Sequence, residues 1–394
     1  MDGSASPYQP APFRIAIDDA VLEDLRRRLA DARWPDEAPG HPPWQLGADL
    51  NRIRALAEYW RDGYDWRAEE AALNALPQFV VELDQIRLHF IHCPGRGPAP
   101  LPLLLPHGWP SSTAEMRHFI PMLTDPARFG GDPEDAFSVV APSLPGHGFS
   151  YRAGQRRLSI PQIADLLATL MTDVLGYRRF GVQGGDWGAF IATRLGFARP
   201  EMLLGIHLSL LAIPRERSSE AGASAEEAAF YDQLDQWLRE ETGYIQIMGT
   251  KPQTLAYALH DSPAGILAWI VEKWQQWTDF DRHFNSSAGR DALLTNVMLY
   301  WATGAIGSTF WPYYARLHEP WIVPPHGKVE VPMGYAAFPK EILLPPRSLA
   351  ERTYADIRRW TVMSHGGHFP ALECPEMLVE EVRAFFRPLR RSLT

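Results

Sequence analysis

The stretch Gly181-Val182-Gln183-Gly184-Gly185-Asp186-Trp187-Gly188-Ala189-Phe190 decides how the rest of the chain is interpreted. A short apolar run leads into it, and the residues after it have the pattern of a buried helix face, so Asp186 falls where a strand gives way to a helix. Gly184, Asp186 and Gly188 meet the small-x-nucleophile-x-small pattern of a nucleophile elbow. Glycine suits this strained turn because strand and helix approach too closely for a Cβ. The stretch therefore predicts a nucleophile displayed at the edge of a parallel sheet.

The residue at the centre of this turn is a carboxylate. A serine that displaced a leaving group from saturated carbon would be left as an ether, whereas an aspartate forms an ester that water can cleave. Asp186 therefore indicates attack on alkyl carbon, in an epoxide or an alkyl halide. Two other interpretations are weaker: an ordinary helix-capping aspartate, and a dinucleotide-binding loop, whose G-x-G-x-x-G spacing is not met.

The composition is that of a globular protein. At 394 residues and 46% hydrophobic content, the chain can bury one large α/β domain with additions. The net charge of −9 argues against nucleic acid as a partner. The two cysteines, Cys93 and Cys374, are too few for a disulfide framework or a structural zinc site, and no metal or cofactor is expected.

Other features of the composition bear on source and location. Only four of the 38 basic residues are lysine, which indicates a G+C-rich bacterial genome. The first residues contain no apolar signal segment, and the longest apolar run is too short to span a bilayer. A cytoplasmic protein without a membrane anchor is the expectation.

The order of periodic patterns predicts four segments. Residues 1–76 are expected to form a helical N-terminal extension. In residues 77–212, apolar strands alternate with helices, which predicts the first part of a mostly parallel, doubly wound α/β sheet. Residues 213–321 break that alternation, are rich in tryptophan and are expected to form a helical lid. Residues 322–394 are expected to complete the core.

Local patterns predict several elements within these segments. Residues 1–12 are small and polar and are expected to be frayed. Residues 78–83 and 86–92 alternate in part and are separated by two polar residues, which predicts a hairpin. Further strands are expected at 329–336 and 360–364. The site should then lie where the parallel strands end.

A carboxylate nucleophile needs hydrogen-bond donors for the oxyanion that forms when its ester is hydrolysed. The backbone N–H of Trp187, directly after the nucleophile, is one candidate. The turn His107-Gly108-Trp109-Pro110 follows an earlier apolar strand and is the usual source of the second donor, the N–H of Trp109. We expect His107, Gly108, Pro110 and the Trp187 side chain to line the substrate pocket.

The base for the second step should be a histidine on a loop after the last strand. His365 and His368 are both present there, and His368 is preferred because flanking glycines let its ring turn inward and Phe369 can pack beside it. A metal pair of the two is not expected, since Gly-Gly between them is unfit for a helix and no third ligand is near. Glu341, after the preceding strand, is the natural carboxylate to hold His368 in one tautomer. The chain order Asp186, Glu341, His368 is the one expected for an α/β-hydrolase fold.

Together these motifs resemble the α/β-hydrolase epoxide hydrolases of the microsomal and juvenile-hormone type. The motifs are His107–Pro110, Gly184–Gly188, Phe338-Pro339-x-Glu341 and Gly366–Phe369. The likeness extends to the extension, at 64–67, and to the lid, at 242–244, 250–252, 261–263 and 272–274, so it covers nearly the whole chain. Microsomal members begin with a membrane anchor, and this sequence is expected to depart from them because its first residues form no apolar segment.

The resemblance also implies an acid for the leaving oxygen. In that family two lid tyrosines hydrogen-bond the epoxide oxygen, and the matching positions are Tyr244 and Tyr314, with Tyr313 as an alternative to Tyr314. A phenol with a pKa near ~10 can protonate an alkoxide and is itself neutral at pH 7. Phe149, Tyr313 and Phe369 are further expected to line the pocket.

The expected reaction is the two-step hydrolysis of an epoxide to a vicinal diol through an ester on Asp186. Haloalkane dehalogenase is the nearest alternative, because it shares the Asp-Trp pair and the ester chemistry. A catalytically silent hydrolase fold that binds a small hydrophobic ligand is a second one. The aromatic lid indicates a bulky or aryl epoxide, and secondary metabolism is the expected setting. The stereochemistry of opening and the oligomeric state, a homo-oligomer included, are left open by the sequence.

Overall fold

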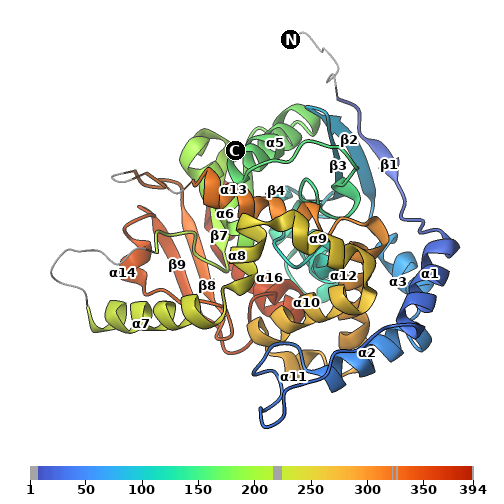
Figure 1. Cartoon of the computed structure of the whole chain (residues 1–394). Coiled ribbons are helices and arrows are strands. Elements are labelled where there is room, and N and C mark those ends of the chain that lie inside the picture. Colours follow the sequence, from blue (N-terminus) through green and yellow to red (C-terminus); the bar gives the residue numbers. More distant parts are fainter. Residues whose placement is uncertain (1–7, 216–223, 322, 325–326, 393–394) are drawn as a thin grey trace.

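A computed structural model describes residues 8–215, 224–321, 323–324 and 327–392 of the chain. Within these residues, nine strands form one sheet in the order β1-β2-β3-β5-β4-β6-β7-β8-β9. The strands are β1 (Ala11–Phe13), β2 (Gln78–Leu83), β3 (Ile86–Cys93), β4 (Leu101–Leu104), β5 (Phe137–Pro142), β6 (Phe180–Gly184), β7 (Leu203–Leu208), β8 (Met333–Ala337) and β9 (Ile357–Val362). From β5 to β9 all neighbours are parallel, and β1 to β3 form an antiparallel edge. Figure 1 shows that edge at the right and β8 and β9 at the left.

The centre of the sheet is covered by helices on both faces. Every residue of β5, β6 and β7 is buried, as parallel strands between two helical layers require. One face packs against α4 (Phe119–Thr124) and α16 (Pro375–Phe386), and the other against α5 (Ile160–Thr169) and α6 (Asp186–Ala198). Along the chain, the short helix α14 (Arg347–Ala350) precedes β9, and the short helix α15 (Pro370–Glu373) follows it. The predicted α/β-hydrolase architecture is confirmed.

The N-terminal extension consists of α1 (Asp19–Ala30), α2 (Leu50–Asp62) and α3 (Trp66–Leu73). Each helix begins after an aspartate whose side chain accepts a hydrogen bond from a backbone N–H of the first turn; these are Asp18, Asp49 and Asp65. The prediction that residues 1–12 are frayed is wrong for 11 and 12, because Ala11–Phe13 pair with β2; residues 1–7 lie outside the described part. A strand of three residues is too short to show a periodic pattern. The pairing of β1 with the free edge of β2 could therefore be found only from the structure.

Between β7 and β8 the chain forms a helical lid. Its helices are α7 (Ala225–Glu240), α8 (Gly243–Thr250), α9 (Pro252–Asp261), α10 (Pro263–Trp277), α11 (Phe280–His283), α12 (Ser287–Thr303) and α13 (Trp311–His318). They lie inside the segment 213–321 that the sequence assigns to a lid. Strands β8 and β9 begin four and three residues away from the predicted starts, and Val329 contributes only an isolated bridge to Tyr354.

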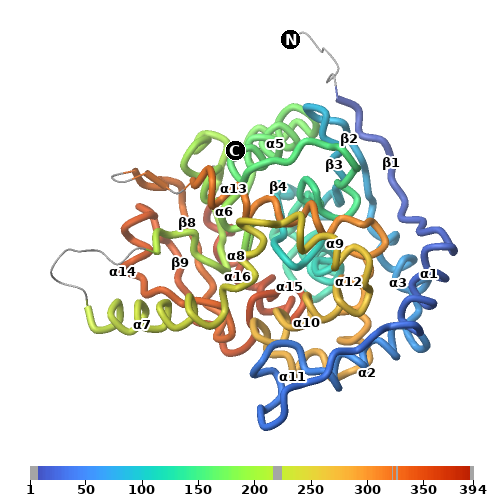
Figure 2. Tube along the Cα trace, in the orientation of Figure 1, coloured from blue at the N-terminus to red at the C-terminus, as the bar shows by residue number. Residues whose placement is uncertain are grey.

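The extension is bonded directly to the lid. The hydroxyl of Tyr59 donates to Asp291 at 2.7 Å, and the hydroxyls of Tyr64 and Thr295 lie 2.9 Å apart. Arg28 also forms an ion pair with Asp261 at 2.8 Å. Figure 2 shows the blue extension running along the yellow and orange helices α10 to α12. The lid helices α9 and α12 are therefore held by residues of the N-terminal extension, which precedes the core in the sequence.

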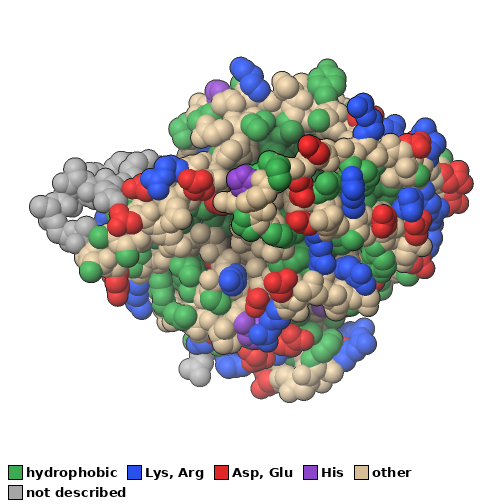
Figure 3. All heavy atoms as spheres, turned by 60° about the horizontal axis from the view of Figure 1, so that its bottom comes forward, with side chains coloured by type: hydrophobic (Ala, Val, Ile, Leu, Met, Phe, Trp, Pro, Cys, Tyr) green, Lys and Arg blue, Asp and Glu red, His purple; other side chains and the backbone are tan. Residues whose placement is uncertain are grey.

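The surface carries charges of both signs. On the face shown in Figure 3, Lys and Arg side chains are interspersed with Asp and Glu. Within the described ranges, no helix combines the length and the apolar character needed to cross a membrane.

Candidate active site

Asp186 lies at the turn between β6 and α6, as the sequence predicts. Its φ is 45°, in the left-handed region that non-glycine residues rarely adopt. A Cβ on Gly188 would lie 2.1 Å from the Pro106 carbonyl oxygen, and one on Gly184 would lie 2.6 Å from the backbone of Gly188. The two glycines therefore permit the close approach that forces Asp186 into its strained conformation.

The turn after β4 brings a hydrogen-bond donor to this carboxylate. The backbone N–H of Trp109 donates to Asp186 Oδ1 at 2.7 Å. A Cβ on Gly108 would lie 2.4 Å from the same oxygen, so glycine is needed for the turn to come this close. The N–H of Trp187 belongs to the first turn of α6, where amides have no acceptor within the helix. Its donation to the oxyanion stays a prediction.

His107 braces this turn from inside the core. Its Nε2 accepts from the N–H of Leu144 at 3.1 Å, so Nδ1 carries the proton and donates to the carbonyl oxygen of Gly108 at 2.8 Å. Burial lowers the pKa of His107 to about 4. The neutral ring thus holds the backbone of the turn in place while it lines the small cavity beside Asp186.

Side chains of the lid hold the same turn from the other side. The carbonyl oxygen of Pro110 accepts from Asn296 Nδ2 at 2.7 Å and from the indole N–H of Trp274 at 3.3 Å. The hydroxyl of Tyr300 donates to the carbonyl oxygen of Ser111 at 2.7 Å. Helices α10 and α12 therefore fix the segment that carries the Trp109 donor. Sequence reasoning missed these three lid residues, since a polar side chain in a helix gives no sign of which distant carbonyl it meets.

Glu341 and His368 meet Asp186 at the predicted edge of the sheet. His368 Nδ1 donates to Glu341 Oε1 at 2.6 Å, and the same oxygen accepts from the N–H of Ile342 at 2.7 Å. On the other side of the ring, Nε2 lies 3.5 Å from Asp186 Oδ2. Burial acts to lower the pKa of His368, but the carboxylates of Glu341 and Asp186 outweigh it and raise the pKa to about 10.

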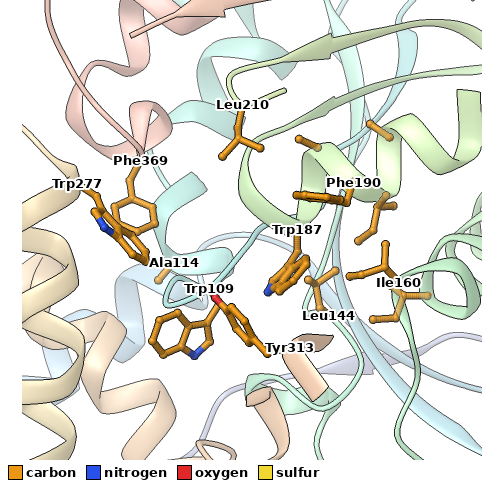
Figure 4. Packing of buried hydrophobic residues seen from close by; sticks show 14 of the residues in the cluster. Trp109, Ala114, Leu144, Ile160, Trp187, Phe190, Leu210, Trp277, Tyr313 and Phe369 are labelled. Atoms are coloured by element: carbon orange, nitrogen blue, oxygen red, sulfur yellow. The ribbon is translucent and has the colours of Figure 1, made fainter. Parts of the chain in front are cut away.

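The lid places two buried tyrosines beside the two tryptophans. They are Tyr244, as predicted, and Tyr313, which was the alternative to Tyr314. Tyr244 stacks on the Trp109 ring with centroids 5.6 Å apart. Tyr313 packs edge-on against Trp187 at 4.8 Å and lies 5.7 Å from Tyr244; Figure 4 shows it between the two indoles. Tyr314 instead stacks on His318 at 4.0 Å and is half-buried.

The structure thus brings Tyr313, the alternative, to the site in place of Tyr314, and Tyr313 becomes the candidate for the second acid. Adjacent residues on an α-helix point about 100° apart, so only one of the pair can face the site. Burial and the nearby phenol of Tyr244 raise the pKa of Tyr313, and burial raises that of Tyr244. Both phenols are thus neutral at pH 7.

The remaining predicted pocket residues divide into two groups. Phe369 packs against the His368 ring at 4.8 Å and against Trp274, also at 4.8 Å. Phe149 packs against Phe13 and His89 of the antiparallel strands, and its place in the pocket stays a prediction. The described residues contain no group of three His, Cys, Asp or Glu side chains that could hold a metal ion.

Glu373 is a further buried carboxyl that sequence reasoning missed. Its Oε1 accepts from the N–H of Gly367 and of Phe369, both at 3.1 Å, on either side of His368. Its Oε2 accepts from the N–H of Asp279 in the lid at 2.8 Å. Burial raises the pKa of Glu373 to about 7. One side chain thus ties the histidine loop to the end of α10.

Changing Glu373 to glutamine is expected to lower the free energy of unfolding by about 1–3 kcal/mol, because an amide nitrogen cannot accept from the N–H of Asp279. Urea denaturation of the wild type and the variant measures this. Glu58→Gln, on the exposed face of α2, is the control and should change stability by about 0.5 kcal/mol or less. Equal stability of both variants would contradict the role given to Glu373.

Comparison with known proteins agrees with this geometry. An elbow nucleophile, a histidine and a carboxylate at the edge of a mostly parallel sheet define an α/β hydrolase, and residues 102–244 match the family model "alpha/beta hydrolase fold". Residues 10–116 match the model "Epoxide hydrolase N terminus". A protein of Stigmatella aurantiaca, provisionally named an epoxide hydrolase, is 40% identical over 96% of this chain and 85% of its own. Epoxide hydrolase 1 of Oryctolagus cuniculus is 34% identical over 97% and 89%. The chain belongs to the epoxide hydrolase family.

A solved structure extends the likeness to nearly every element. The crystal structure of juvenile hormone epoxide hydrolase from Bombyx mori superposes with a TM-score of 0.84 at 27% identity, over 99% of this chain and 96% of that one. The extension, the core and the lid are thus all shared with an enzyme of this family.

Proposed function

We propose that this enzyme opens its epoxide through a covalent ester on Asp186 and hydrolyses that ester with His368. The bond from the Trp109 N–H to Asp186 Oδ1 carries the proposal. It fixes one carboxylate oxygen and leaves Oδ2 to attack the ring carbon. Oδ1 then becomes the ester carbonyl oxygen, already beside the donor that stabilises its oxyanion in the second step.

In the first step the phenols of Tyr244 and Tyr313 donate to the epoxide oxygen. As the C–O bond breaks, one phenol gives its proton to the alkoxide. Both rings lie against the indoles of Trp109 and Trp187, which flank the nucleophile, so the oxygen and the attacked carbon can be held at once. The buried aromatic walls exclude bulk water during this step.

Ester formation changes the charge around His368. With two carboxylates beside it the ring has a raised pKa of about 10 and carries a proton. The ester is neutral, so one of the two charges is lost and the pKa of His368 falls. The ring can then take a proton from water, and Glu341 stabilises the imidazolium. Cleavage of the ester releases the diol and a proton, which restores the tyrosine.

The substrate we propose is a bulky or aryl apolar epoxide. The buried rings of Trp109, Trp187, Trp277 and Tyr313 form an aromatic cluster, shown in Figure 4, and Trp109 and Trp187 belong to the two turns that carry and contact Asp186. A bacterial, cytoplasmic enzyme of secondary metabolism is part of the same proposal, and it is supported by the lysine-poor composition alone.

Single turnover in H₂¹⁸O tests the ester. Enzyme in excess is mixed with styrene oxide, and the diol and the Asp186 peptide are analysed by mass spectrometry. If Asp186 attacks, its own oxygen enters the diol and the label enters the aspartate, so the first diol is unlabelled. A diol that carries ¹⁸O after one turnover would mean direct attack by water and would overturn the proposal.

One observation keeps dehalogenation as a second candidate. The indole N–H groups of Trp109 and Trp187 are buried and have no hydrogen-bond partner among the residues described. Such groups could bind a departing halide. Chloride release from 1-chlorohexane, with no diol from styrene oxide, would favour this reaction.

The tyrosine assignment gives a direct prediction. Tyr313→Phe is expected to lower kcat for styrene oxide by about 10²-fold, since it removes a proton donor beside the epoxide oxygen. Tyr314→Phe is the matched control, one residue along the same helix, and should leave kcat within about twofold. Steady-state assays of diol formation measure both. A large loss in Tyr314→Phe alone would restore the assignment made from sequence.

A further inference from the structure

A small polar cavity lies against the nucleophile and the histidine on the side of the core. Its volume is about 30 Å³, and Asp186 and His368 both line it. Its other polar lining residues are His107, Ser111, Glu115, Gln183 and Ser209. A cavity volume of roughly 10–15 Å³ is enough to admit one water molecule. This one has the size and the polar groups to hold water.

Two buried polar atoms of the lining need a partner. Among the described residues, Ser209 Oγ makes no hydrogen bond, and His368 Nε2 has only the distant Asp186 Oδ2, at 3.5 Å, although both side chains are buried. Buried polar atoms are normally bonded to protein or to ordered water. Two such atoms on one cavity of this size indicate that water bridges them. His368 Nε2 is also the atom that must accept the proton in the second step.

The cavity shares His107, Gly108 and Phe369 with the expected substrate pocket but does not extend to the two lid tyrosines. Residues of η1 (Thr113–Met116), α15 and α16 close its far side: Met116, Ala371 and Leu378. Tyr244 and Tyr313, which face the epoxide oxygen, are not part of its lining. Water held here can therefore stay in place while the substrate occupies the lid side, and it reaches the ester carbonyl from the core side.

Glu115 is the carboxyl of this lining that the mechanism has not used. It bonds to Ser111, and it is close enough to Asp186 and His368 to feel both charges. Burial, with a contribution from Asp186, raises the pKa of Glu115 to about 8, while Ser111 and His368 oppose the shift. Its carboxyl can accept from a water molecule and adds little negative charge beside the attacking carboxylate at neutral pH.

We infer that Glu115 is a positioning residue that, together with Ser209, holds the water molecule which His368 deprotonates. The inference rests on the proposed ester mechanism. One hydrogen of the water goes to His368 Nε2, and the other is bonded by Glu115, so that the oxygen lone pair points at the ester carbonyl. The new C–O bond forms as the proton moves to His368, and the bond to the diol oxygen then breaks as the His368 imidazolium returns that proton to the leaving oxygen.

Glu115→Leu separates this role from a structural one. It removes the acceptor for the water at similar side-chain size, whereas the amide oxygen of a glutamine could still accept, and only ester hydrolysis needs the water. Stopped reactions with styrene oxide, read by intact-protein mass spectrometry, give the rates of ester formation and decay. We expect formation within about threefold of wild type and decay slowed by about 10–100-fold, with the ester accumulating. In the variant, the rate of ester hydrolysis should also no longer show the change with pH that titration of Glu115 causes in the wild type. Equal slowing of both steps, or of neither, would overturn the inference.

Two further measurements keep the outcomes distinct. Ser209→Ala removes the second water contact and is expected to slow decay by a smaller factor while formation is unchanged, which tests the inference even if Glu115→Leu folds poorly. Glu201→Gln, on the exposed surface, should change neither rate. If ¹⁸O enters the wild-type diol in one turnover, the ester mechanism itself fails; if it enters Asp186 and both variants behave as wild type, only the role of Glu115 fails.

Discussion

The His368→Gln variant is expected to stop at the ester and to accumulate it. Glutamine cannot take a proton from water, whereas formation of the ester needs only Asp186 and the two phenols. Diol formation should fall by about 10²–10⁴-fold. After mixing with styrene oxide, the intact protein should gain the mass of one epoxide, and peptide mapping should place it on Asp186.

His365→Gln is the matched control for this experiment. His365 lies three residues earlier on the same glycine-rich loop and is half-buried, with its Nδ1 bonded to Ser364 at 3.0 Å. This variant should form diol at close to the wild-type rate and show no adduct. A His368→Gln protein that forms neither adduct nor diol, beside an active wild type, would mean that the histidine acts before the ester exists.

Asp186→Ala is expected to abolish both the adduct and the diol. It removes the attacking oxygen, so activity should fall by about 10⁴-fold or more. It also leaves the N–H of Trp109 without its acceptor, which costs about 1–3 kcal/mol of stability. Residual activity is measured by diol formation, and folding by thermal unfolding.

Asp186→Asn separates the chemical loss from the structural one. The amide oxygen can still accept from the N–H of Trp109, so this variant should unfold close to the wild-type temperature. Its rate of ester formation should nevertheless be far below that of the wild type, because an amide is a much weaker nucleophile than a carboxylate. In the double variant of Asp186→Ala with His368→Gln, the adduct should be absent. An adduct that persists there would place the covalent bond on another residue.

The sequence could predict the site where the chemistry depends on local pattern or on chain order. Gly184, Asp186 and Gly188 are required by one tight turn, and the turn is visible within five residues. Glu341 and His368 each follow a strand of a parallel sheet, and the ends of such strands meet at one edge. These three residues could therefore be brought together without knowledge of any distant contact.

The remaining features depend on contacts that no local pattern encodes. Tyr313 and Tyr314 are equivalent in the sequence, and only the rotation of α13 against α8 decides between them. Glu115 lies in a short 3₁₀ segment, where an acidic residue has the pattern of an exposed turn. The binding of Pro110 by Asn296 joins residues 186 positions apart, and only the assembled lid reveals it.

Some lid helices are attached to the N-terminal extension and others are not, and this difference bears on how the substrate specificity can be changed. Helices α9 and α12 are bonded to the extension, and α10 packs against it. Helices α10 and α12 also hold the Pro110 turn, whereas Tyr244 and Tyr313 are carried by α8 and α13, which pack on each other. Directed evolution aimed at α8 and α13 can therefore reshape the entrance and the walls for new substrates against a fixed scaffold. Libraries on α10 and α12 would instead disturb the donor that every substrate shares.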